Sequence, residues 1–554
     1  MNIKTLTPIQ LWQDFKNDCC TLDMSIVGYE NIDNISIISY YFTALKLECG
    51  DVRVFVKTYA KAGTTNNKTM IIVDEFDKDL DKSFLKFFVK EGYTVITFDY
   101  KGVKKGDTCY THYPTCVEYG NLEKSADYIN TANHGTQNTC LFLWAKLTRR
   151  VITFAQSLSI CNPNAIVAIA SDTSVNLLAQ VAGTDDRLKA VIFIRNHGFS
   201  DYNANTKQAL STTYSPDMQA ERNRWIIGCA MPSYIKFVDC PIIYFGASND
   251  NVYDFSYLVD MLHLLKDPNK CYISMSIGTT SSIYNNVYST SINLLDNIFS
   301  GQQDIVKPTI SYKVDEDSLA FDIACDITYN QINYCNIHYS YSNAPFALKN
   351  WHTQNVGIGI DGKGHIHIKT YSKNDIIYAY TTVEYKDGTM LSSPPIKVDP
   401  SQLDIKLNIK NNRIIYEKKY GTKGFFIHTN DLVVSNNHIY LKTGALEISG
   451  ITSNYGELIS YSIGDIENKN SEAILQFDCF SDIEKTITIK LTDINFNEFF
   501  CEINISNSKN WQKFSMSVAD FKDKDNKPLS SWQDIKAFSF VNAENIIFNN
   551  IIWI

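Results

Sequence analysis

The sequence predicts a multidomain chain of the α/β + all-β class, with one α/β domain followed by two β-sandwiches. Its 554 residues exceed a single domain, because domains usually hold roughly 100–200 residues. Before Pro308, apolar β-rich runs alternate with helix-like stretches. After Pro308 the helical periodicity ends, and short alternating strands separated by Asn, Asp and Gly replace it. The change in periodicity therefore marks a change of fold class within the chain.

Near-continuous apolar runs in the first part of the chain predict strands that are buried on both faces. Helix-like stretches separate these runs, which is typical of a parallel sheet covered by helices on both sides. The predicted strands are residues 51–60, 69–76, 94–99, 165–170, 189–194, 241–247 and 271–278, with 35–49 as an antiparallel first strand. The predicted helices are residues 82–91, 140–159, 174–182 and 253–266.

The composition excludes some functions. The 51 Lys+Arg and 60 Asp+Glu give 51 − 60 = −9, and such an acidic chain has no basic stripe for nucleic acid. The sequence shows no signal peptide and no apolar run of membrane-spanning length, so we expect a cytoplasmic protein without membrane contact. Its 14 cysteines form no C-x-x-C pair, so we expect reduced thiols and no zinc site or other cofactor.

Three segments of the first domain carry a family resemblance. They are LTPIQLWQDF near the start, EGYTVITFDYKGVKKGD at 91–107, and AIVAIASDTSVNLLAQVAGTDDRLKAVIFI at 165–194. The last resembles the strand–elbow–helix–strand unit that holds the nucleophile in α/β-hydrolases, and the whole domain looks most like the acetylxylan esterase and dipeptidyl-peptidase branch. This resemblance implies an α/β-hydrolase domain over residues 1–303 and an active site at the elbow.

The residues at the expected catalytic positions depart from the family pattern. The family motif is G-x-S-x-G, whereas residues 170–174 read ASDTS and place Asp172 at the nucleophile position. Asp250, in GASNDNV, matches the catalytic acid. Thr279 occupies the histidine position, and no histidine lies between His263 and His338. Because a hydroxyl nucleophile is inert without a base, these positions predict a site that no longer hydrolyses esters or peptides.

The expected oxyanion region is also altered. The strand that should supply backbone N–H donors ends in Asp74, Glu75, Asp77 and Asp79. Carboxylates repel a developing oxyanion, which again argues against hydrolysis.

Two alternatives stay open at this point. An active carbohydrate esterase or related hydrolase would need a displaced base, and His112, His134 or His197 could supply it; His263 is expected to be a half-buried packing residue. Alternatively, Asp172 and Asp250 could approach each other near Asp74 or Glu75 and hold a divalent cation, although the sequence predicts no metal ligand set.

The rest of the chain predicts two binding or spacer modules. Residues 304–401 resemble a fibronectin- or immunoglobulin-like β-sandwich, and 402–554 resemble a galactose-binding-type jelly roll of carbohydrate-binding modules. The jelly-roll resemblance is carried by LQFDCFSDIEKTITIKLTD, NWQKFSMSVADFK, LSSWQDIKAFSFV and IIFNNIIWI. Sugar rings stack on exposed aromatic side chains, so the predicted ligand-binding residues are Tyr455, Trp511 and Trp532, with Tyr461 as a further candidate. The expected function is a catalytically degenerate scaffold that binds a glycan or glycoconjugate, with a protein partner as the other possibility.

Overall fold

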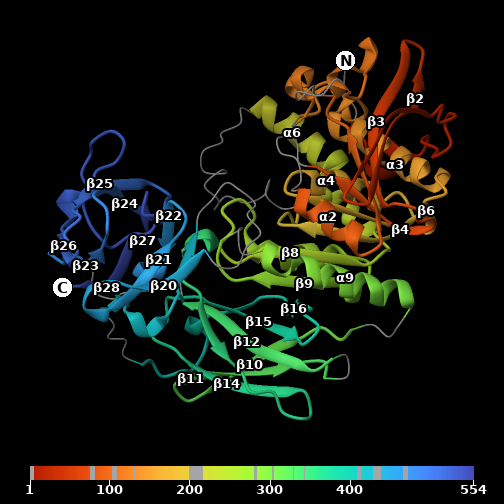
Figure 1. Cartoon of the computed structure of the whole chain (residues 1–554). Helices are drawn as coiled ribbons and strands as arrows, with labels where there is room; N and C mark the ends of the chain where they lie inside the picture. The colour runs from red at the N-terminus through yellow and green to blue at the C-terminus, as the bar shows by residue number, and fades with distance from the viewer. Residues whose placement is uncertain are drawn as a thin grey trace.

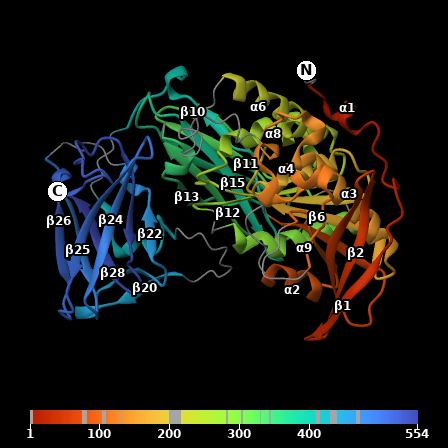
Figure 2. The ribbon, with the colours of Figure 1, turned by 90° about the horizontal axis from the view of Figure 1, so that it is seen from above.

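The chain folds into three regions that follow one another along the sequence, as the computed structural model shows (Figure 1). An α/β region at the N-terminus and a β region at the C-terminus lie on either side of a central β region (Figure 2). The structure describes residues 5–74, 82–102, 109–129, 131–198, 216–279, 283–301, 305–327, 330–341, 344–408, 414–427, 438–465 and 472–554.

One nine-stranded sheet organises the α/β region, in the order β1-β2-β3-β5-β4-β6-β7-β8-β9. The pairs β1–β2, β2–β3 and β3–β5 are antiparallel, and every later pair is parallel. The predicted α/β region with a largely parallel sheet is therefore confirmed. The strands are β1 (Ser25–Ile32), β2 (Ile35–Leu47), β3 (Gly50–Lys61), β4 (Asn67–Val73), β5 (Thr94–Asp99), β6 (Cys161–Ser171), β7 (Leu188–Ile194), β8 (Ile242–Ala247) and β9 (Cys271–Ser276).

Helices cover both faces of this sheet. Helices α3 and α4 pack in one apolar core, and α2 and α9 pack in a second core on the opposite face. None of the helices in the described parts of the chain combines the length and apolarity needed to cross a bilayer. The helices are α1 (Pro8–Trp12), α2 (Lys82–Lys90), α3 (Cys140–Ser157), α4 (Ser174–Ala182), α6 (Pro216–Cys229), α7 (Met231–Tyr234), α8 (Leu258–Leu264) and α9 (Tyr284–Ser300).

The edge strand β1 was not predicted. Its sequence, SIVGYENI, mixes apolar and polar residues around a glycine. Because β1 pairs only with β2 and its side chains stay largely exposed, it lacks the continuous apolar run of a buried strand. The hydrophobic pattern therefore cannot reveal it.

The central region contains two antiparallel sheets that face each other across a shared core. One has the order β10-β11-β14, and the other has the order β13-β12-β15-β16 with β17 beside β15. The strands are β10 (Thr309–Asp315), β11 (Ser318–Ala324), β12 (Ile332–Tyr341), β13 (His352–Asn355), β14 (Lys363–Lys369), β15 (Ile377–Tyr385), β16 (Met390–Ser392) and β17 (Ile396–Val398).

The C-terminal region also consists of two antiparallel sheets, which confirms the predicted change to all-β structure. Their orders are β20-β21-β28-β23-β26, with β18 beside β28, and β19-β22-β27-β24-β25. The strands are β18 (Ile414–Tyr416), β19 (Phe425–Ile427), β20 (Ile439–Thr443), β21 (Ser449–Ser453), β22 (Glu457–Ser460), β23 (Leu475–Phe480), β24 (Lys485–Asp493), β25 (Glu498–Ile505), β26 (Gln512–Met516), β27 (Ile535–Val541) and β28 (Ile547–Trp553).

The α/β and central regions share buried contacts. Phe346 and Trp351 of the central region belong to the α/β core. The buried amide of Asn249 donates to the backbone carbonyls of Phe346, Ala347 and Lys349, at 3.3, 3.3 and 2.7 Å. A buried side chain that satisfies several carbonyls fixes the contact in one arrangement, so the loop after β8 is held by the central region.

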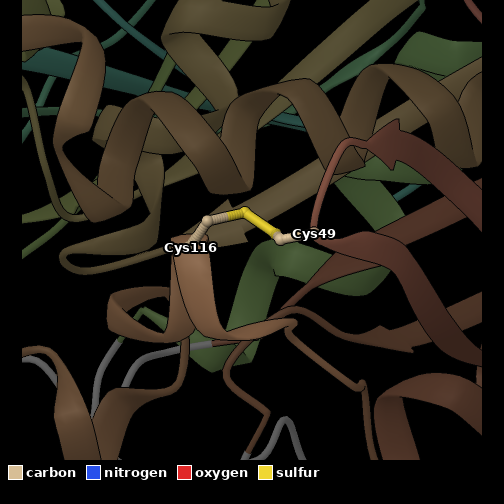
Figure 3. Close-up of a disulfide and its surroundings, with 2 residues drawn as sticks. All are labelled: Cys49 and Cys116. Carbon is tan, nitrogen blue, oxygen red and sulfur yellow. A yellow bond between two sulfur atoms is a disulfide. The ribbon is translucent and has the colours of Figure 1, made fainter.

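One disulfide departs from the expectation that the thiols are reduced. Cys49, in the turn between β2 and β3, is joined to Cys116 in the short helix η1 (Thr115–Gly120) (Figure 3). Their Cα atoms are 6.2 Å apart although the residues are separated by 67 positions. Sequence spacing could not predict this pair, because only the folded sheet brings the β2–β3 turn to η1.

Candidate active site

The elbow expected from the sequence is present, with an aspartate at its tip. Strand β6 ends at Ser171, helix α4 begins at Ser174, and Asp172 between them has φ +52°. The backbone N–H of Asp172 donates to the carbonyl of Ile194 at 3.0 Å. A non-glycine residue in this left-handed conformation costs about 1–3 kcal/mol and persists only where its surroundings impose it. The elbow therefore carries a carboxylate at its strained tip, where the family motif has a serine.

The serines beside Asp172 do not replace a nucleophile. The hydroxyl of Ser174 is buried and donates to the carbonyls of Ser171 at 2.6 Å and Val73 at 3.1 Å. Ser171 is the last residue of β6 and is only 2% exposed. The hydroxyl of Ser174 thus binds the elbow to the neighbouring strand β4.

Asp250 lies in the loop after β8, where the catalytic acid was expected. It is 3% exposed, and its Oδ1 accepts hydrogen bonds from the backbone N–H groups of Val252 at 2.8 Å and Tyr253 at 3.1 Å. These bonds fix the carboxylate toward the elbow. The structure brings Asp172 and Asp250 together, but through a third residue.

Arg195 links the two carboxylates. Its Nε and Nη2 donate to Asp250 at 2.8 and 3.2 Å, and its Nη1 donates to Oδ2 of Asp172. Burial opposes the charged guanidinium, but the charges of Asp250 and Asp172 outweigh burial and raise the pKa of Arg195. A bidentate arginine–carboxylate pair is strong and directional. The guanidinium therefore occupies the place between the carboxylates that a divalent cation would need.

Arg195 was not among the predicted site residues. It directly follows the buried strand β7 and has φ +72°, whereas the family resemblance directs attention to the residues after β6, β8 and β9. A charged residue immediately after an apolar strand is the signal that could have suggested it, because buried charges require partners.

Tyr253 donates a hydrogen bond to the second carboxylate oxygen of Asp172. Its hydroxyl donates to Oδ1 of Asp172 at 2.6 Å, and the Arg195 guanidinium lies over its ring at 5.5 Å. Burial, followed by the charge of Asp172, raises the pKa of Tyr253, so the phenol stays protonated and donates. With both oxygens engaged, Asp172 is a poor nucleophile for ester formation.

The C-terminal region covers the expected histidine position. Thr279 is 8% exposed and its hydroxyl donates to the carbonyl of Ile427 in β19 at 2.9 Å. Beside it, a Cβ atom at Gly278 would lie 2.1 Å from the ring of Phe426. A side chain larger than Thr279 would therefore meet the neighbouring region rather than an open cleft.

Three histidines were candidates for a displaced base. The ring of His112 lies against Tyr41 and Tyr110, and that of His134 stacks on Tyr128 at 4.5 Å. Only His197 lies near the acid loop, where its ring contacts Tyr253 and Tyr257 at 5.9 and 6.3 Å.

Burial weakens His197 as a base. It lowers the pKa of this 1%-exposed ring to about 4, although the charge of Asp250 opposes the shift. General-base catalysis at neutral pH works best with a pKa near the operating pH, so His197 is a weak base. His263, expected to be half-buried, is exposed instead.

The remaining predicted features fall partly outside the described residues. Asp74 follows β4, and its carbonyl accepts a hydrogen bond from the Tyr100 hydroxyl. Glu75, Asp77 and Asp79, the other predicted carboxylates of the oxyanion region, lie outside the described residues. Within the described ranges, no group of three or more His, Cys, Asp or Glu side chains is arranged to hold a metal ion.

The predicted ligand-binding role of Trp532 needs correction. Trp532 is 0% exposed, its ring packs against Trp553, and its indole N–H donates to the carbonyl of Ala473 at 2.8 Å. Tyr461 is likewise buried, at 4% exposure. Trp532 belongs to the core of the C-terminal region, whereas Tyr461 packs in a separate cluster with Ala344 and Leu348 of the central region.

Tyr455 and Trp511 remain partly accessible. Tyr455 is half-buried and meets the ring of His438 edge-on at 4.4 Å. Trp511 is half-buried, and its indole N–H donates to the carbonyl of Ala445 at 2.9 Å. The two rings are held in place while part of their surface faces solvent.

The α/β region is thus a nine-stranded, largely parallel sheet with an elbow between β6 and α4. No protein-family model matches the sequence, and no curated protein matches it significantly.

Similar solved structures include esterases at low sequence identity. Acetyl xylan esterase 1 from Thermoanaerobacterium sp. is 9% identical, with 54% of this chain and 96% of that chain covered and a TM-score of 0.39. The acetyl xylan esterase from Paenibacillus sp. R4 is 10% identical, with 54% and 96% covered and a TM-score of 0.39. Est1E from Butyrivibrio proteoclasticus, with ferulic acid bound, is 13% identical, with 47% and 98% covered and a TM-score of 0.34.

The low pKa of His197 predicts acid sensitivity. The folded state holds this ring neutral down to about pH 4, whereas its ordinary value is 6.5, so stability is lost as the pH falls from about 6.5 toward 4. At about 1.4 kcal/mol per pH unit, the contribution of His197 falls by about 2 kcal/mol between pH 6.5 and 5. We expect His197→Gln to reduce the difference between Tm values measured at pH 7 and pH 5. The exposed His263→Gln should keep the wild-type difference; an equal difference in His197→Gln would contradict the assignment.

Proposed function

We propose that this chain is a catalytically inactive α/β-hydrolase-like protein that serves as a scaffold and binds a carbohydrate or glycoconjugate. The single observation that carries the loss of catalysis is the contact of Arg195 with both Asp172 and Asp250. Through this contact, the residues at the expected nucleophile and acid positions form one ion cluster with Arg195. Hydrolysis through an aspartyl ester would require a free carboxylate oxygen and then a base that activates water.

The arrangement of the three regions supports a scaffold. We propose that the central region is an immunoglobulin- or fibronectin-like sandwich, and that the C-terminal region is a carbohydrate-binding-like jelly roll. Contacts from both regions around Asn249 and Thr279 support one continuous body rather than a mobile catalytic domain. Proposed domain limits are 1–303, 304–401 and 402–554.

Tyr455 and Trp511 are the proposed sugar-stacking residues of the C-terminal region. Each is half-buried and supported by a second ring, His438 for Tyr455 and Phe480 for Trp511. A ring fixed in this way loses little conformational entropy when a sugar stacks on it.

The absence of turnover is tested with p-nitrophenyl acetate and the full chain. We expect hydrolysis no faster than with heat-denatured protein, and the rate should be the same in Asp172→Asn and in the exposed-site variant Asp239→Asn. Robust hydrolysis that Asp172→Asn abolishes would instead support the alternative, an active carbohydrate esterase with a displaced base.

Glycan binding is tested by applying the full chain to a glycan array. We expect binding to a defined set of glycans, with roughly a tenfold loss in Tyr455→Ala or Trp511→Ala. A tenfold loss corresponds to about 1.4 kcal/mol, and removing a ring on which a sugar stacks costs an energy of this order. Phe426→Leu, which alters a ring at the contact with the α/β region, is the matched control and should retain binding. No binding to any glycan, or binding unaffected by both aromatic variants, would leave protein recruitment as the better account.

A further inference from the structure

A pair of cysteines in the central region lies close together across its two sheets. Cys325 follows β11 in one sheet, Cys335 lies on β12 in the other, and their sulfur atoms are 3.9 Å apart. We propose that Cys325 and Cys335 form a peroxide-sensitive dithiol that closes to a second disulfide. This inference is independent of the proposed function.

The geometry requires only a small movement of the side chains. A disulfide holds its sulfur atoms about 2.05 Å apart, so the two atoms must approach by roughly 2 Å. Rotation of the two side chains about their Cα–Cβ bonds can supply this approach. The backbone on both sides is fixed, since the N–H of Cys325 donates to Gly362 at 2.8 Å and the carbonyl of Cys335 accepts from Val356 at 2.8 Å.

The two thiols differ in a way that suits stepwise oxidation. Cys325 is partly exposed, whereas Cys335 is 1% exposed. The hydrogen bond with Cys325 lowers the pKa of Cys335 despite burial, and the Thr381 hydroxyl, 3.4 Å from its sulfur, acts in the same direction. A dissolved oxidant reaches the partly exposed Cys325 first, and the buried Cys335 beside it is the sulfur that then closes the disulfide.

Hydrogen peroxide is a small oxidant that can reach the partly exposed sulfur of Cys325. The Cys325 thiolate attacks one peroxide oxygen, the O–O bond breaks, and a sulfenic acid and hydroxide form. The Cys335 sulfur then attacks the Cys325 sulfur, the S–O bond breaks, and water leaves. The two thiols lose two electrons in total and one peroxide is reduced to two waters, with both thiol protons ending in water.

Closure would join the two sheets of the central region. Cys335 belongs to an apolar core that also contains residues of the α/β region, and Cys325 packs against it. The adjacent Asp326 is 8% exposed and accepts a hydrogen bond from the backbone N–H of Val306 at 3.0 Å, on the segment that enters the central region. The Cys325–Cys335 disulfide would thus connect the segment around Val306, where the chain enters the central region, to the opposite sheet. It should therefore stabilise the central region.

The test is thiol mapping of the full chain. The protein is treated with hydrogen peroxide or buffer, its free thiols are alkylated in denaturant, and the digests are compared by mass spectrometry without reduction. We expect peroxide to produce a Cys325–Cys335 crosslinked peptide that dithiothreitol removes. Cys229, whose pKa burial raises to about 12, serves as an internal control and should stay alkylatable. The oxidised protein should also melt a few degrees higher.

The variant Cys335→Ser separates the pair from general oxidation. It should give no crosslink at Cys325 and no rise in Tm, whereas Cys229→Ser should behave like the wild type. Complete alkylation of both Cys325 and Cys335 after peroxide treatment would overturn the proposal. Oxidation of either sulfur to a sulfinic acid without crosslinking would overturn it as well.

Discussion

The positive charge of Arg195 stabilises the two carboxylates, Asp172 and Asp250, that lie at the ends of strands β6 and β8. The fold places Asp172 at the strained elbow and Asp250 in the facing loop, and both side chains are largely shielded, at 21% and 2% exposure. Two shielded carboxylates that face one site repel each other unless a cation lies between them. Arg195 supplies that cation with a bidentate contact to Asp250 and a further contact to Asp172. The elbow and the facing loop are therefore held together by one guanidinium and two carboxylates that stabilise one another.

Contacts from outside the α/β region hold the loops that follow β8 and β9. The loop after β9, where the histidine was expected, is held by the C-terminal region through Thr279 and Phe426. The loop after β8 is held by the central region through Asn249. Loops at the carboxyl ends of parallel strands normally form the ligand site of such a sheet. Their use as contact surfaces here supports the scaffold that we propose, in which recognition falls to the β regions.

Hydrophobic periodicity in the sequence was enough to predict the buried strands of the α/β region and the loops that follow them. Strand β5 was predicted with the limits observed, and Asp172 and Asp250 were placed at the elbow and in the acid loop, because a strand–turn–helix unit fixes those positions locally. Three features depended on long-range contacts. Arg195 acts across 55 positions to reach Asp250, Cys49 pairs with Cys116 across 67 positions, and the buried indole of Trp532 donates to the carbonyl of Ala473 across 59 positions. Residue type and local spacing carry no information about such partners.

The most direct test of the account is the stability of the Arg195 cluster, measured as Tm. Removing one partner from a shielded ion pair costs about 3–5 kcal/mol, whereas neutralising the whole set can cost little. We predict that Arg195→Met lowers the Tm by several degrees, while the triple variant Arg195→Met, Asp172→Asn, Asp250→Asn recovers most of that loss. Lys266→Met, which breaks the exposed pair with Asp239, should change the Tm little. If Arg195→Met melted like Lys266→Met, or if the triple variant recovered none of the loss, the carboxylates would not depend on Arg195 and the account would be wrong.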